Sequence, residues 1–98
     1  MNKRNGKYMD NVGNQYWYKN GLLHRNNAPA VIMAPNGAEG QQQKEWYKNG
    51  ERHRKNGPAV ITEDGDLIWF IEGKLIKYVI TPDTKDHFTD EEFLADFK

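Results

Sequence analysis

The sequence contains neither cysteine nor serine, and these two absences exclude several kinds of chemistry. Without cysteine the chain has no disulfide and no thiol that could act as a nucleophile or ligate a soft metal. Without serine it lacks the nucleophile of the familiar hydrolase triads. The glycines follow turn patterns and match neither a P-loop nor a dinucleotide-binding fingerprint. We therefore expect a protein that is not an enzyme, with no catalytic residues, no cofactor and no metal.

Long apolar runs are also missing. The chain has no stretch of about 18 apolar residues that could cross a membrane, and no signal peptide or lipidation motif is visible. These absences predict a soluble, cytoplasmic protein with no membrane partner. Its 98 residues, 37% of them apolar, are enough for a single domain with a small core, so one face of its sheet should remain wet.

The dominant positive feature is an internal repeat. Residues 17–32 have the sequence WYKNGLLHRNNAPAVI and residues 46–61 have the sequence WYKNGERHRKNGPAVI, which agree at twelve positions with an offset of 29. A partial third copy starts at Trp69, 23 residues after the second WYKNG. The basic period is therefore about 23 residues, and the longer step contains extra residues near 33–35 and 39–43.

The repeat divides the expected single domain, residues 1–98, into successive units. A partial unit opens the array, two full units follow, and a third, partial unit and a change of composition close it. Because terminal units of repeat arrays need caps, we interpret the last segment as a helical cap. The predicted bounds are 1–13 for the first partial unit, 14–42 and 43–68 for the full units, 69–82 for the last partial unit and 83–98 for the cap.

Turn signals within the units predict β-hairpins. Asn-Gly at 20–21, 36–37 and 49–50 and Asp-Gly at 64–65 interrupt runs of aromatic and β-branched residues, and both dipeptides accept the positive φ of two-residue hairpin turns. The predicted fold class is mainly β, an antiparallel β-hairpin repeat sheet connected as a meander, with a short C-terminal α-helix. The predicted strands are 6–10, 14–19, 22–25, 29–34, 43–48, 51–54, 58–63, 66–72 and 74–80.

The turn positions also predict which side chains face each other across a hairpin. Counting outward from Asn49-Gly50 brings opposite charges, and a cation and an aromatic ring, to facing positions. The same counting from Glu72-Gly73 sets Trp69 opposite Ile76. The pairs predicted around Asn49-Gly50 are Lys48 with Glu51, Tyr47 with Arg52, Trp46 with His53, and Glu45 with Arg54.

Two His-Arg pairs raise the question of chemistry at His24 and His53. Each histidine is either a metal ligand or acid/base group, or a packing group stacked on Trp17 or Trp46 with its tip hydrogen-bonded. We favour packing, because Ile76 takes this position in the third unit and no cysteine or clustered carboxylate lies at zinc-like spacing.

The C-terminal segment has the signature of a helix start. Thr89 and Glu92 form a capping box, and Phe88 and Phe93 form a hydrophobic staple. These signals predict a short helix over about 90–97 whose apolar stripe lies on the sheet. It serves either as a cap for the open end of the array, which we favour, or as a recognition helix.

Charge is divided unevenly along the chain. Residues 1–58 carry ten Lys and Arg against four acids, and residues 59–98 carry four against ten, so the halves have net charges of +6 and −6. A basic half with interleaved aromatic residues favours an acidic protein or a single-stranded nucleic acid as partner. Cross-strand ion pairs use part of this charge, and the overall charge is zero, so nucleic acid is the weaker of the two predictions.

The repeat pattern W-Y-x-N-G-x-x-H-R-x-x-G-P-A-V-I, then D-G and then W, resembles short repeats of tailed-bacteriophage proteins and of some large DNA viruses. It is similar, more distantly, to MORN repeats, whose units also form successive β-hairpins. The resemblance covers residues 13–80 and is most specific in HRKNGPAVI at 53–61, whereas Ala28 replaces Gly57 in the first copy. It implies a phage-type accessory protein in the cytoplasm of a host cell.

We interpret the chain as a protein-binding module that acts by stoichiometric binding to a host or viral protein, to inhibit a host defence or redirect host machinery. A single-stranded nucleic-acid-binding protein is one alternative, and a self-associating sheet that forms a homodimer through an open edge is another. The acidic helix is a second candidate surface. The predicted partner-binding residues are the exposed aromatic and basic side chains of the full units, Tyr18, Arg25, Tyr47, Arg52 and Arg54.

Overall fold

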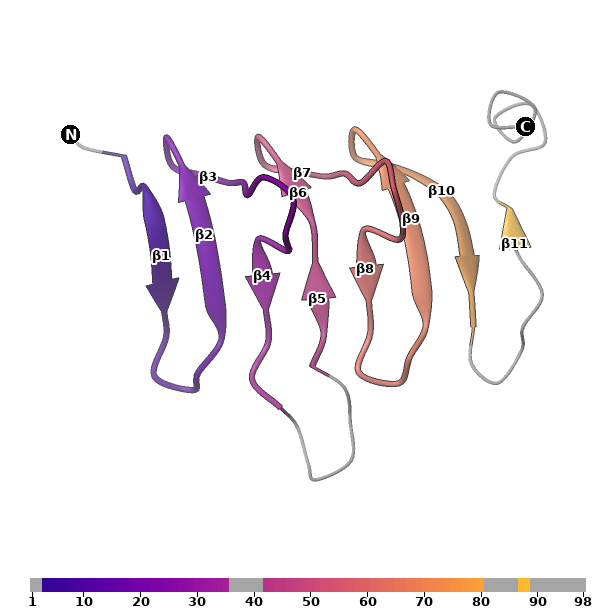
Figure 1. Ribbon diagram of the computed structural model, residues 1–98, viewed down its shortest axis with the longest axis horizontal. Helices are drawn as coiled ribbons and strands as arrows, with labels where there is room; N and C mark the ends of the chain where they lie inside the picture. Colours follow the sequence, from indigo (N-terminus) through magenta and orange to yellow (C-terminus); the bar gives the residue numbers. More distant parts are fainter. Residues whose placement is uncertain (1–2, 36–41, 81–86, 89–98) are drawn as a thin grey trace.

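The computed structural model describes residues 3–35, 42–80 and 87–88, which form antiparallel β-sheet (Figure 1). No helix occurs within these residues. The prediction of a mainly β, antiparallel fold is therefore confirmed for the described residues. The predicted helix over 90–97 and the predicted turn at Asn36-Gly37 lie outside the described residues.

The strands follow each other across the sheet in chain order. The order in the main sheet is β1-β2-β4-β5-β8-β9-β10-β11, β3 pairs with β2, and β6 and β7 form a two-stranded sheet. The strands are β1 (Gly6–Met9), β2 (Gln15–Lys19), β3 (Leu22–Leu23), β4 (Val31–Ile32), β5 (Lys44–Glu45), β6 (Tyr47–Lys48), β7 (Glu51–Arg52), β8 (Val60–Ile61), β9 (Leu67–Ile71), β10 (Lys74–Val79) and β11 (His87–Phe88).

In both repeated segments, residues 17–32 and 46–61, a loop separates two short strands. Tyr18 in β2 pairs with Leu23 in β3, whereas Tyr16 in the same strand pairs with Val31 in β4. The segments β3 and β4 therefore share β2 as a neighbour, and the loop 24–30 lies between them in the chain. The second full unit has the same plan, because β6 pairs with β7 and β5 pairs with β8, with the loop 53–59 between (Figure 1).

The two-residue hairpin turns form where Asn-Gly predicted them. Asn20 and Asn49 have φ of 51° and 49°, and each is followed by a glycine with positive φ. Asp64-Gly65 is different, because the amide of Gly65 donates to the carbonyl of Thr62 and only the glycine has positive φ, at 91°. This is a longer loop that ends in a left-handed glycine, so the prediction of a two-residue turn there is wrong.

The register next to the Asn49-Gly50 turn is confirmed, since Lys48 pairs with Glu51 and Tyr47 with Arg52. The amide of His53 still donates to the carbonyl of Trp46, but beyond that pair the predicted register fails. Glu45 pairs with Val31 and Val60 and not with Arg54, because the chain turns into the loop 53–59 just after β7.

In the third hairpin, Trp69 pairs with Lys77 and not with Ile76 as predicted. The register shifts between Leu75 and Lys77, so Ile76 is the extra residue of a β-bulge. Ile76 is buried, which gives the shift a physical reason: the bulge turns an apolar side chain inward and brings a lysine to the tryptophan.

Successive residues of a strand point to opposite faces, so the sheet has a tryptophan face and a tyrosine face. On the tryptophan face, the register places Ala30 between Trp17 and Trp46, and Ala59 between Trp46 and Trp69. Both alanines are 0% exposed, so the indoles and the groups above them cover the sheet there. Alanine leaves room for a large ring on each side.

The tyrosine face is defined by two rows of side chains that cross the strands. One row contains Tyr8, Tyr16, Val31, Glu45, Val60 and Ile68, as the register of β1, β2, β4, β5, β8 and β9 shows. The other row contains Tyr18, Leu23, Tyr47, Arg52 and Phe70. Aromatic and aliphatic groups therefore dominate this face.

Candidate functional site

On the tryptophan face, each tryptophan ring makes a cation–π contact with the side chain eight residues later in the chain. The guanidinium carbon of Arg25 lies 3.8 Å from the ring centroid of Trp17, and the Nζ of Lys77 lies 4.3 Å from that of Trp69. Arg54 lies 3.9 Å from the ring of Trp46. At these distances the cation and the electron-rich ring face attract each other.

The two stacked arginines are also tied to their own loops. Arg25 Nη1 donates to the carbonyl of Pro29 at 3.1 Å, and Arg54 Nη1 donates to that of Pro58 at 3.0 Å. Each guanidinium therefore closes the loop that interrupts the strand and covers a tryptophan at the same time. This double role explains why the loop sequence recurs in both full units.

The histidines connect each unit to the next one. Nδ1 of His24 accepts a hydrogen bond from the amide of Asn49 at 3.0 Å, and Nδ1 of His53 accepts one from Glu72 at 2.9 Å. Oδ1 of Asn5 does the same for the amide of Asn20 at 2.9 Å. The predicted hydrogen-bonded tip is confirmed, but the tryptophan rings carry arginines, so the predicted stacking partner is wrong.

Replacement of His53 tests this turn contact. His53→Ile should lower the free energy of unfolding by about 0.5 to 1 kcal/mol, because the amide of Glu72 loses its acceptor. His53→Asn should retain most of the stability, because Asn5 serves a turn in the same way. Denaturant unfolding measures both variants, and equal stability of His53→Ile and the wild type would contradict the contact.

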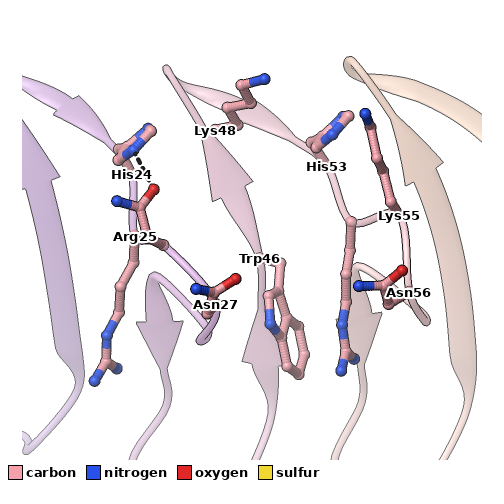
Figure 2. Close-up of a pocket in the computed structure, with 10 residues that line it drawn as sticks. His24, Arg25, Asn27, Trp46, Lys48, His53, Lys55 and Asn56 are labelled. Atoms are coloured by element: carbon pink, nitrogen blue, oxygen red, sulfur yellow. Dashed lines mark hydrogen bonds between the residues drawn. The ribbon is translucent and has the colours of Figure 1, made fainter.

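A hollow of about 550 Å³ opens on the tryptophan face between the two loops (Figure 2). The loop 24–27 forms one side, the loop 53–56 forms the other, and Trp46 lies between them. No carboxylate is among the described residues that line it. Its polar lining consists of His24, Arg25, Asn26, Asn27, Lys48, His53, Arg54, Lys55 and Asn56.

The charged groups among the described residues that line the hollow are cations. Burial lowers the pKa of Arg54. The ion pair between Arg52 and Glu45 lies on the other face. The guanidiniums, the lysines and the asparagine amides of the hollow can therefore donate hydrogen bonds to an anionic ligand.

The tyrosine face is organised around the buried carboxylate of Glu45. Oε1 of Glu45 accepts from the hydroxyl of Tyr47 at 2.9 Å and from Arg52 Nε at 3.1 Å, and Oε2 accepts from the side-chain Nε2 of Gln43 at 3.0 Å. Burial and then the hydrogen bond to Glu45 raise the pKa of Tyr47. Tyr47 and Arg52 are thus held in one fixed arrangement.

Toward β1, the tyrosine face becomes an aromatic surface with a cation above it. The ring centroids of Tyr8 and Tyr16 are 6.1 Å apart, and those of Tyr16 and Tyr18 are 6.4 Å apart. The guanidinium of Arg4 lies 4.3 Å from the ring of Tyr8. Tyr8 is 41% exposed, so the surface is open to a partner at this edge.

The structure divides the predicted contact residues between the two faces. Tyr18, Tyr47 and Arg52 lie together on the tyrosine face, whereas Arg25 and Arg54 lie on the tryptophan face at the hollow. Sequence reasoning missed the asparagines that line the hollow, Asn26, Asn27 and Asn56. Asn27 and Asn56 at equal places in the two copies, each two residues after the arginine, are the signal that was present.

No family model, curated protein or solved structure matches this sequence. Within residues 3–35, 42–80 and 87–88, no helix is long and apolar enough to cross a membrane. In the same residues, no three His, Asp or Glu side chains gather as a group that could hold a metal ion.

Proposed function

We propose that the protein is a small phage-type accessory protein that acts as a non-enzymatic protein-binding module in the host cytoplasm. Its partner is a host or viral protein, which it inhibits or redirects by stoichiometric binding. The observation that carries this proposal is the tyrosine face, where aromatic rings, aliphatic side chains and arginines lie in two rows on one side of the sheet.

The composition of the tyrosine face supports a protein partner. Tyrosine and arginine are the residues that most often dominate binding energy in protein interfaces, and charged groups other than arginine are depleted there. The carboxylate in the middle of this face, Glu45, is 7% exposed and lies under Tyr47 and Arg52. A partner would therefore contact the rings and the guanidinium.

We further propose that the sheet is an array of β-hairpin units with a C-terminal helical cap. Contacts that recur 29 residues apart support the array, because Arg25 and Arg54 make the same stack and the same hydrogen bond, and His24 and His53 bond to the following turn. An array of this kind holds neighbouring units in a fixed relation and so makes a rigid, extended surface.

Two neighbouring residues of β1 give a matched test. Tyr8 and Met9 are both exposed, at 41% and 54%, but they point to opposite faces. A partner recovered from bacterial lysate with the wild-type protein should bind Tyr8→Ala about thirtyfold more weakly, which is about 2 kcal/mol. Met9→Ala should bind normally, and titration calorimetry measures both affinities.

Tyr18→Ala extends the test to the neighbouring strand and should weaken binding to a similar extent. Circular dichroism establishes that each variant is folded. Loss of binding in Met9→Ala with normal binding in Tyr8→Ala would place the contact surface on the other face. Failure to recover any protein stoichiometrically with the wild type would contradict the proposed function itself.

A further inference from the structure

The hollow on the tryptophan face has features that the protein-binding proposal does not use. Arg25, Lys48, Arg54 and Lys55 bring four cations to one concave surface, and no carboxylate is among the other described residues that line it. Like charges gathered in this way repel each other, and burial already lowers the pKa of Arg54. An anion in the hollow would relieve both effects.

The arginines of the hollow are held in place before any ligand arrives. Each is stacked on its tryptophan and bonded to a proline carbonyl, which uses one of the five N–H groups of a guanidinium. A side chain that is already ordered loses little conformational freedom when it binds. Charge-assisted hydrogen bonds from such donors to an oxyanion are short and strong.

The size and the remaining lining of the hollow indicate more than a single small ion. A volume of about 550 Å³ falls within the range of sites that enclose a small organic molecule. Asn26, Asn27 and Asn56 add amide groups that both donate and accept hydrogen bonds, so they suit the neutral polar part of a ligand.

The next hollow along the sheet limits the length of the ligand. Lys48 and His53 line both hollows, and Asn49, Glu51 and Glu72 complete the lining of the second, so carboxylates lie directly beside the cationic hollow. A nucleic-acid strand that continued along the sheet in this direction would bring its phosphates to Glu51 and Glu72. The arrangement therefore favours a compact anion over an extended polyanion.

We propose that the hollow between the loops 24–27 and 53–56 binds a compact ligand that carries several phosphate groups, the class to which nucleoside triphosphates belong. The lysines and arginines hold the phosphates, and the asparagine amides contact the rest of the ligand. This site lies on the face opposite to the proposed protein-binding surface, so either proposal can fail without the other.

Titration calorimetry with ATP and with tripolyphosphate, both without divalent metal, tests the site. We expect saturable binding with one ligand per chain. The Lys48→Gln/Lys55→Gln variant removes two charges of the hollow without touching the stacked arginines, and it should bind at least tenfold more weakly. Lys3→Gln/Lys19→Gln removes the same charge outside the hollow and should bind normally.

Nuclear magnetic resonance locates the ligand on the full chain. Backbone amide signals of His24, Asn27 and Asn56 should shift on titration, whereas those of β1 should not. Binding of a ten-residue oligothymidylate more tightly than ATP would overturn the proposal in favour of a nucleic acid. Equal loss of affinity in the control variant, shifts confined to other residues, or no saturable binding at millimolar ligand would also overturn it.

Discussion

Trp46→Ala is expected to lower the free energy of unfolding by about 3 kcal/mol, which is the lower end of the usual cost of truncating a packed aromatic ring to alanine. The indole lies between Ala30 and Ala59, both 0% exposed, and it carries the guanidinium of Arg54 at 3.9 Å. Truncation would expose both alanines and leave Arg54 without its ring. Since small domains have little stability to spare, much of the chain population would unfold.

Trp46→Phe is the matched control for this prediction. Phenylalanine keeps a ring beneath Arg54 and covers part of the alanines, so it should cost much less than alanine. Urea unfolding followed by circular dichroism measures both variants without depending on the fluorescence of the residue that is changed. Equal midpoints for Trp46→Ala and the wild type would show that the tryptophan face contributes little to stability.

The parts of the fold that the sequence predicted well depend on local chemistry. Asn20-Gly21 and Asn49-Gly50 form turns with positive φ at both residues, as asparagine and glycine allow. The pairs next to the second turn follow from simple counting. Near a turn, the backbone itself determines which residues face each other, so a sequence pattern is sufficient.

The parts that it predicted wrongly depend on what happens farther along the strand. The bulge at Ile76 changes the register of the third hairpin by one residue. In the second full unit the chain enters the loop 53–59, and Arg54 stacks on the ring of Trp46 in place of the predicted His53. Bulges arise from packing of the whole sheet and have no dipeptide signal. A pattern was nevertheless present, because each tryptophan is followed eight residues later by a cation.

The candidate sites were only partly predictable for a related reason. Tyr18 and Arg25 were grouped because they are exposed residue types in the same unit, yet they lie on opposite faces. The chain between them turns and enters a loop, so the alternation of a simple strand does not extend across it. The hollow needs two loops that are 29 residues apart in the sequence, and its lining follows only from their placement side by side.

Glu45 is the feature of the sheet that local reasoning would least expect. It occupies a row position between Val31 and Val60, where a third valine would continue the apolar pattern. Its carboxylate is satisfied by three side chains and lies beneath two predicted contact residues, Tyr47 and Arg52. A buried charge of this kind adds little to the stability of the fold. Its main effect is to fix the positions of the side chains that bind it.

Arg52→Ala is therefore expected to lower the free energy of unfolding by about 2 kcal/mol, because it leaves a buried carboxylate without its counter-ion. Removing one partner of a fully buried pair costs about 3 to 5 kcal/mol. The side chain of Arg52 is 43% exposed, against 10% for that of Glu45, so solvent screening reduces the effect. Thermal unfolding at neutral pH measures the change.

The double variant Glu45→Val/Arg52→Leu separates a missing counter-ion from missing contact area. It completes the valine row and removes both charges, so it should recover most of the stability that Arg52→Ala loses. Tyr47 would lose its acceptor as well, but this residue is only half-buried. If the double variant were as unstable as Arg52→Ala, the carboxylate itself would have to be stabilising. If instead it were stable but no longer bound the partner, the ion pair would serve to hold Tyr47 and Arg52 in the geometry that recognition requires.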